Sequence, residues 1–132
     1  MKEIKGPEDC NRNCGSHALG LKHWFDFDSV PDDAYDNDAV KCYMNDMVAE
    51  LLEKYPRLRR VDRDYVSKHL NKTIIALRCS NTDFHFCLRK HRRWTAKWGS
   101  NTITIMSKDE VMNQPWQRFW DSYNSEIVYF TK

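Results

Sequence analysis

Two residues of this chain have types and positions suited to chemistry: a cysteine near its start and a histidine in its second half. Cys14 lies in the run Asn-Cys-Gly-Ser-His-Ala-Leu-Gly at residues 13–20, at the predicted first turn of a helix. The thiolate is the reactive form of cysteine, and the positive end of a helix dipole lowers the pKa of a thiol. Position alone therefore makes Cys14 a candidate nucleophile for attack on a carbonyl carbon.

The candidate base is His85, in the strand-like run Thr-Asp-Phe-His-Phe-Cys-Leu at residues 82–88. Because side chains alternate along a strand, Phe84, Phe86 and Leu88 share one face, whereas Asp83, His85 and Cys87 share the other. We therefore expect His85 to point away from the aromatic core face.

Composition indicates the class of protein. A chain of 132 residues with 41% hydrophobic residues is long enough for one domain with a real core, so we predict a single domain over residues 1–132. Five cysteines, an odd number, without an apolar secretory segment after Met1 favour a reducing, cytoplasmic location. No run is apolar enough to span a membrane, and we expect neither a cofactor nor a bound metal.

Charge is distributed unevenly along the chain. Residues 1–56 carry six Lys and Arg against twelve Asp and Glu, whereas residues 57–132 carry fifteen against seven. Basic residues gather at Arg57, Arg59, Arg60 and Arg63 and at Arg89, Lys90, Arg92 and Arg93. This asymmetry fits a protein substrate or partner with a charged surface, and the second cluster is a candidate contact for nucleic acid. The alternative is that both clusters are ordinary solvated surface without a binding role.

Two helices are predicted in the first half. Asn13 is a suitable N-cap for a helix over residues 13–25. Its apolar stripe would consist of Ala18, Leu21, Trp24 and Phe25. Residues 26–38 are predicted to form an exposed acidic loop, and a second helix over residues 38–55 is expected to end before Pro56.

The second half has a β pattern. Short stretches rich in β-branched and aromatic residues predict strands over 73–79, 83–90, 93–97, 102–106 and 126–131. Ser107 and Glu110 fit a capping box, and Pro115 suits the first turn of another short helix containing Trp116, Phe119 and Trp120. The expected fold class is α+β, with N-terminal helices packed on an antiparallel sheet.

These features together resemble the papain-like cysteine hydrolase superfamily. The resemblance is closest to small bacterial and phage domains with Asn-Cys-x-x-(His/Tyr)-Ala-Leu, then Asp-x-His-Phe, then Trp-x-x-Lys-x-Gly. The three motifs stand here at residues 13–19, 83–86 and 94–99, and the final Ile-Val-Tyr-Phe at 127–130 is similar to the closing strand of such domains.

The resemblance implies a Cys-His acyl-enzyme mechanism. Cys14 would attack an amide, ester or thioester carbonyl, and His85 would activate the thiol and later protonate the leaving group. The function expected is a thiol-dependent amidohydrolase, either a cysteine peptidase or a protein glutamine amidase. Trp94, Trp98 and His17 are the residues expected to contact the substrate.

The third catalytic residue departs from the family pattern, because Ala96 stands where relatives carry a polar side chain that orients the histidine. Asp83, Thr95 and Asn101 are the candidate replacements. A bare Cys-His dyad and a loss of catalysis are equally compatible with an alanine at this position. The oxyanion hole would use the backbone N–H of Cys14 and a second donor, either Asn11 or Asn13.

Two further classes of function stay open. One is a papain-like scaffold without catalysis that binds a host protein or a nucleic-acid complex, with Trp94 and Trp98 beside the basic cluster as its contacts. The second is a zinc-binding domain using Cys and His side chains, although the chain lacks a Cys-x-x-Cys knuckle. The candidate zinc ligands are Cys10, Cys14, His17, Cys79, His85, Cys87 and His91.

Overall fold

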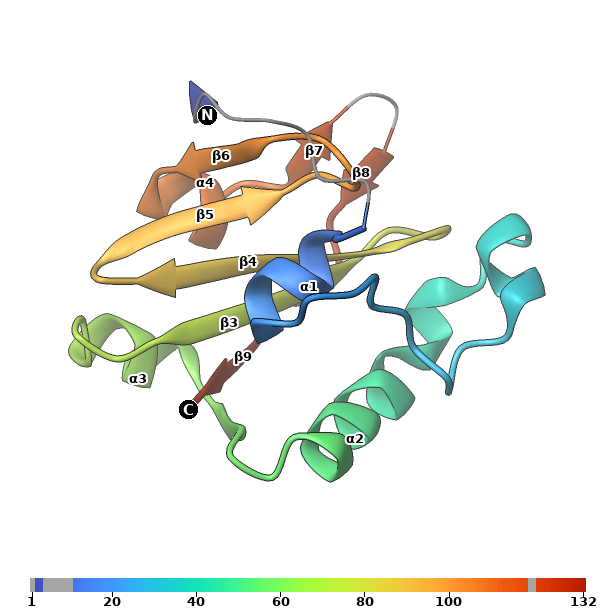
Figure 1. The fold of residues 1–132 in the computed structure, drawn as a ribbon, viewed down its shortest axis with the longest axis horizontal. Coiled ribbons are helices and arrows are strands. Elements are labelled where there is room, and N and C mark those ends of the chain that lie inside the picture. The colour runs from blue at the N-terminus through green and yellow to red at the C-terminus, as the bar shows by residue number, and fades with distance from the viewer. Residues whose placement is uncertain (1, 4–10, 119–120) are drawn as a thin grey trace.

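Among the residues that the structure describes, the strands form a seven-stranded sheet with antiparallel neighbours and a separate two-stranded sheet (Figure 1). The structure is a computed structural model and describes residues 2–3, 11–118 and 121–132. The larger sheet has the order β1-β6-β5-β4-β3-β9-β2. Its strands are β1 (Lys2–Glu3), β2 (Arg59–Val61), β3 (Ile74–Cys79), β4 (Phe84–Lys90), β5 (Arg93–Lys97), β6 (Ile103–Met106) and β9 (Val128–Thr131). The smaller sheet pairs β7 (Trp116–Arg118) with β8 (Asp121–Tyr123).

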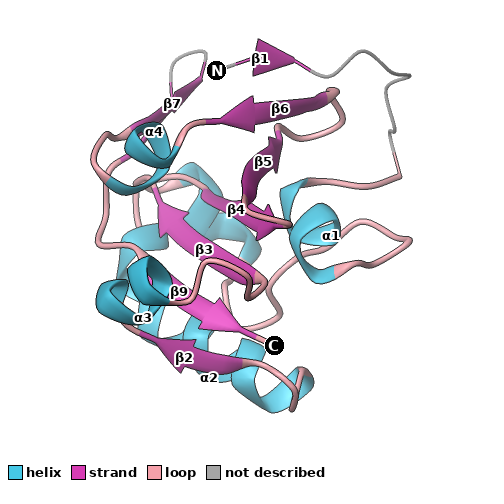
Figure 2. Ribbon diagram, turned by 90° about the vertical axis from the view of Figure 1, so that its left-hand side faces the viewer, coloured by secondary structure: helices cyan, strands magenta, loops and turns pink. Residues whose placement is uncertain are grey.

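Helical segments cover both faces of the large sheet (Figure 2). They are α1 (Cys14–Leu19), η1 (Asp32–Asp36), η2 (Val40–Tyr43), α2 (Met44–Lys54), α3 (Arg63–Lys68) and α4 (Lys108–Met112). In Figure 2, α1 lies on one side of the strands, whereas α3 and α4 lie on the other. The chain is therefore an α+β protein with an antiparallel sheet, as the pattern of helices followed by short strands predicts.

Strand alternation divides the interior into two cores. On β4, Phe84, Phe86 and Leu88 belong to a core shared with α1 and α2, which we call the α1-side core. Cys87 belongs to a core shared with α3 and α4, which we call the α3-side core. Because both faces are covered, β3 and β4 are buried almost throughout, and the predicted orientation of His85, away from the aromatic face, is confirmed.

The first helix is much shorter than predicted. Asn13 caps α1 as expected, but the helix ends at Leu19, not near Phe25. Gly20 takes the left-handed conformation (φ 72°), and its N–H donates to the carbonyl of Ser16, which closes the helix. Phe25 is buried as expected of the stripe, whereas the Trp24 side chain is 50% exposed.

The other predicted helices and strands are confirmed in part. Helix α2 ends before Pro56 as predicted, but it begins only at Met44, after the 3-10 turn η2. The four strands predicted between residues 73 and 106 and the Ser107 capping box are confirmed. The strand β2 and the helix α3 were not predicted.

The prediction of a short helix after Pro115 is wrong, since Trp116 begins the strand β7. The Trp116 indole N–H donates to the carbonyl of Val111 at 2.8 Å, and Trp116 pairs with Tyr123 across the small sheet. These tertiary contacts outweigh the local helix signal. Phe119 and Trp120 of this prediction lie outside the described residues.

Within the described part of the chain, no helix combines the length and the apolar character that a membrane span requires.

Candidate active site

Cys14 is the first residue of α1, and Asn13 fixes the chain around it. The Asn13 side-chain oxygen accepts hydrogen bonds from the backbone N–H groups of Ser16 (3.1 Å) and Phe25 (3.2 Å), while its amide donates to the carbonyl of Phe25 (2.6 Å). At Gly15, an added Cβ would lie only 2.4 Å from a ring carbon of Phe25. The residue after Cys14 must therefore be glycine for Phe25 to pack at the start of the helix.

His85 enters the site from the opposite face of β4 and sits among aromatic rings. Its imidazole stacks on the indole of Trp98, with ring centres 3.9 Å apart and planes inclined by 16°. Tyr123 lies 5.2 Å away by the same measure, and Trp116 meets the imidazole edge-on at 5.9 Å. These contacts bury His85, which is 2% exposed, and they fix the orientation of its ring.

Both residues lie near the point where β4 and β5 separate. The β4–β5 pairing extends from Leu88, opposite Thr95, to Lys90, opposite Arg93, so the earlier part of β4 is not paired with β5. Helix α1 contacts both strands at this split, and the backbone N–H of Phe86 faces the Cys14 sulfur and lowers its pKa. In Figure 1, α1 lies in front of β4. The split allows groups from opposite faces of the sheet to reach one site.

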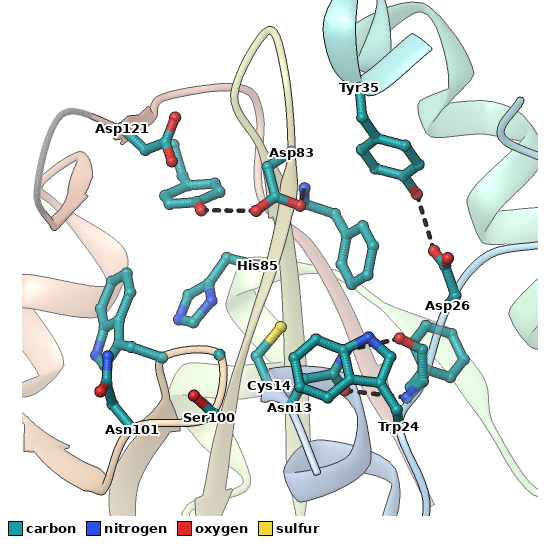
Figure 3. A pocket seen from close by; sticks show the side chains of 15 residues that line it. Asn13, Cys14, Trp24, Asp26, Tyr35, Asp83, His85, Ser100, Asn101 and Asp121 are labelled. Atoms are coloured by element: carbon teal, nitrogen blue, oxygen red, sulfur yellow. Dashed lines mark hydrogen bonds between the residues drawn. The ribbon is translucent and has the colours of Figure 1, made fainter. Parts of the chain in front are cut away.

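A pocket of about 540 Å³ opens at this split, and both Cys14 and His85 line it. Figure 3 shows both side chains entering the pocket, together with Asp83, Asn101 and the indole of Trp24. Its volume lies within the range typical of small-molecule and side-chain sites. The structure therefore brings the predicted nucleophile and base to one cavity.

The thiol of Cys14 is not ionised in this state. Its pKa is raised to about 12, mainly by burial and also by the charge of Asp83. The backbone N–H groups of Phe86, Gly15 and Cys14 itself lower the pKa, but by less than burial raises it. The expectation that the helix start alone lowers the pKa of Cys14 below its ordinary value is wrong, because desolvation is larger than the effect of the nearby N–H groups.

Asp83 lies just before β4 and is held by neutral donors. Its carboxylate accepts hydrogen bonds from the hydroxyl of Tyr123 (3.2 Å) and from the N–H of Phe84 (2.8 Å). Its pKa is raised to about 6, mainly by burial and also by the charges of Asp121 and Asp26. Asp83 thus lines the pocket as a carboxylate whose ionisation is disfavoured by burial.

The remaining candidates for a third catalytic residue occupy different places. Ala96 is fully buried in the α3-side core. Thr95 accepts or donates a hydrogen bond at 2.8 Å with His17, on the α1 side of β5. Asn101 lines the pocket, and its backbone carbonyl accepts a hydrogen bond from the ammonium group of Lys97 (3.0 Å), which also binds the carbonyl of Gly99. Lys97 thereby shapes the loop beside His85.

The two proposed oxyanion donors differ. Asn13 lines the pocket, but its side-chain amide is engaged with Phe25. Asn11 is exposed and is not among the described residues that line the pocket. The backbone N–H of Cys14 faces its own sulfur. The role of either asparagine as an oxyanion donor stays a prediction.

Of the three residues expected to contact substrate, only Trp98 lines this pocket. Trp94 is 3% exposed and packs in the α3-side core, with the Arg89 guanidinium 5.7 Å from its ring centre. His17 binds Thr95 and so attaches α1 to β5. Burial lowers the pKa of His17 to about 4.

The basic cluster is not a continuous surface. Arg89 is 4% exposed, and its guanidinium donates to the carbonyls of Val66 (2.8 Å) and His69 (2.6 Å) at the end of α3. Its prediction as a nucleic-acid contact is therefore wrong, because its donors bind the protein's own backbone. Lys90, Arg92 and Arg93 are exposed, and Arg92 donates to the side chain of Asn71 at 2.9 Å.

The candidate zinc ligands do not converge. Within the described residues, no group of three or more His, Cys, Asp or Glu side chains is placed to hold a metal ion. Cys87 contacts the sulfur of Met106 in the α3-side core, and His91 is exposed in the turn after β4. Cys10 lies outside the described residues.

Sequence reasoning missed several residues of the pocket. Tyr123 lines the pocket and comes from the small sheet, which the sequence pattern did not predict. Trp116 of the same sheet is not in the described lining, but it packs against His85, as Tyr123 does. Trp24, assigned to a helix stripe, stands half-exposed at the pocket, and Tyr35 donates a hydrogen bond to Asp26 across it at 3.1 Å. Only the unusual density of aromatic residues, 13% of the chain, could have indicated such an enclosure.

Comparisons with protein-family models, with curated proteins and with solved structures gave no match. The function must therefore be argued from the site itself.

Proposed function

We propose that the protein is a papain-like, thiol-dependent amidohydrolase that acts on a protein substrate, with Cys14 as nucleophile and His85 as base. The observation that carries this proposal is that a cysteine at a helix start and a histidine on an antiparallel strand line one pocket. The bond cleaved is either a peptide bond or the side-chain amide of glutamine. The free thiols of Cys14, Cys79 and Cys87 fit action in the reducing cytoplasm.

The raised pKa of Cys14 specifies how the reaction begins. Because the thiol is neutral near pH 7, His85 removes its proton while the sulfur attacks the carbonyl carbon, so no ion pair is formed in advance. The new bond joins sulfur to carbon, and the C–N bond breaks as His85 returns the proton to the departing amine. Water then attacks the thioester, which releases the acid and restores the thiol.

Acylation by p-nitrophenyl acetate, followed by intact mass and peptide mapping, tests the proposal. We expect an acetyl group on Cys14, its loss in Cys14→Ser, and at least about a hundredfold slower acetylation in His85→Ala, in line with the usual contribution of a general base. Circular dichroism of each variant establishes that the fold is retained.

Cys79 provides the matched control within the same chain. It is buried, and burial raises its pKa to about 12, as for Cys14, but it is not among the described residues that line the pocket. Acetylation of Cys14 at the rate of Cys79, or at an unchanged rate in His85→Ala, would overturn the proposal.

A second candidate function is a non-catalytic scaffold that binds another protein. Two observations favour it: the neutral, buried thiol of Cys14 and the alanine at position 96, which offers the imidazole no hydrogen bond. For such a scaffold, Cys14→Ser leaves partner binding intact and no acyl adduct forms.

A further inference from the structure

The pocket beside Cys14 carries acidic groups without basic partners. Asp26, Asp83 and Asp121 line it, and no Lys or Arg is among the described residues of its lining. Asp26 accepts from the hydroxyl of Tyr35, Asp83 from that of Tyr123, and Asp121 from that of Thr82 (3.4 Å). All three donors are neutral. The carboxylates are thus positioned by hydrogen bonds from neutral groups, and the described part of the lining contains no Lys or Arg that would offset their negative charges.

The walls of the same pocket are aromatic. Trp24 keeps half of its surface exposed and stands at the pocket in Figure 3. Tyr35, Trp98 and Tyr123 are further aromatic residues of the lining. Aromatic faces attract cations through their quadrupole, and a planar guanidinium both stacks on such faces and matches carboxylates with paired donors. An arginine side chain combines both properties, whereas a compact ammonium group offers only the charge.

We propose that this pocket binds the arginine side chain of the protein substrate, next to the amide that Cys14 attacks. The role as a substrate determinant rests on the proposed hydrolase function, whereas the preference of the pocket for a guanidinium is a binding property independent of catalysis. The guanidinium supplies a positive charge opposite the three aspartates, and the hydrophobic stem of the arginine side chain lies against the rings.

Binding to the Cys14→Ala protein tests this inference without any chemistry. The probes are four pentapeptide amides that differ only at the central residue, which is arginine, lysine, citrulline or glutamate, measured by isothermal titration calorimetry at low salt. Citrulline has the shape of arginine without its charge. We expect the arginine peptide to bind at least about tenfold more tightly than the citrulline peptide, from charge attraction and cation–π contact together. We also expect this preference to shrink as salt is added.

Variants of the pocket localise the effect. Asp26→Asn and Asp121→Asn are expected to weaken the arginine peptide several-fold and to leave the citrulline peptide unchanged. Asp32→Asn, an exposed aspartate in η1 outside the pocket lining, is the matched control and is expected to change neither. Equal affinity of the arginine and citrulline peptides for the Cys14→Ala protein would overturn the inference, whatever the acylation experiment gives.

The two proposals fail separately. Arginine selectivity without acetylation of Cys14 supports the pocket assignment and removes the hydrolase. Acetylation that depends on His85, without arginine selectivity, supports the hydrolase and removes the pocket assignment.

Discussion

At the scale of single residues, the environment of each ionisable group decides its state. Cys14 and Asp83 line the same pocket, and burial favours the protonated form of both. The rings of Trp98 and Tyr123 hold His85 in place, so stacking, and not a hydrogen bond from position 96, fixes the imidazole. The Tyr123 hydroxyl connects this arrangement to Asp83.

Asp83→Asn is expected to change the pH dependence of stability. The pKa of Asp83 is raised from 3.8 to about 6 in the folded protein, so its favourable contribution is complete below about pH 4 and is lost as the pH rises through 6. At about 1.4 kcal/mol per pKa unit, the wild type should lose about 3 kcal/mol relative to Asp83→Asn between pH 4 and pH 7. Urea unfolding at both pH values measures this difference, and parallel pH profiles of the two proteins would contradict it.

At the scale of elements, a few buried polar side chains join segments far apart in the sequence. Asn13 attaches the start of α1 to Phe25, and His17 attaches the same helix to Thr95 of β5. Arg89 of β4 closes the end of α3, because its guanidinium satisfies carbonyls that the helix leaves without partners. Helices α1 and α3 are therefore attached to the sheet by side-chain hydrogen bonds as well as by apolar packing.

Arg89→Leu is expected to destabilise the fold by about 3 kcal/mol, because it leaves buried carbonyls at the end of α3 without donors. Arg93→Leu on the neighbouring strand is the matched control. Arg93 is exposed, so its replacement should change the free energy of unfolding by less than about 0.5 kcal/mol. Equal urea midpoints for the two variants would show that Arg89 has no such role.

At the scale of the whole molecule, the large sheet has a buried centre and short, exposed edge strands. β3 and β4 have neighbours on both sides and a core against each face, whereas β1 and β2 are short, exposed edge strands. The candidate site lies beside β4, the middle strand of the large sheet, where its pairing with β5 stops. A stable centre can thus support a pocket in which charges are poorly compensated.

Amide hydrogen exchange is expected to follow this division. The amides of β3 and of Leu88–Lys90 in β4 should exchange slowest, through global unfolding, whereas those of the edge strands β1 and β2 should exchange fastest in the large sheet. Exchange measured by NMR at several urea concentrations would contradict this division if β2 and β3 opened with the same free energy.

The sequence alone determines the local features of this protein. The alternation of Phe84, His85 and Phe86 fixes which face His85 takes, and Asn13 and Ser107 begin helices because their side chains accept from N–H groups a few residues ahead. Such features depend on neighbours along the chain, so residue order is enough to predict them.

Tertiary structure alone decided the end of α1, the strand at Trp116 and the place of Arg89. It also decided that the Cys14 thiol is neutral, because desolvation depends on what packs around the sulfur and not on the residues beside it in sequence. The aromatic enclosure of His85 joins Trp98, Trp116 and Tyr123, from three segments separated along the chain. Only folding brings these segments together, and so only the fold determines what the site can bind.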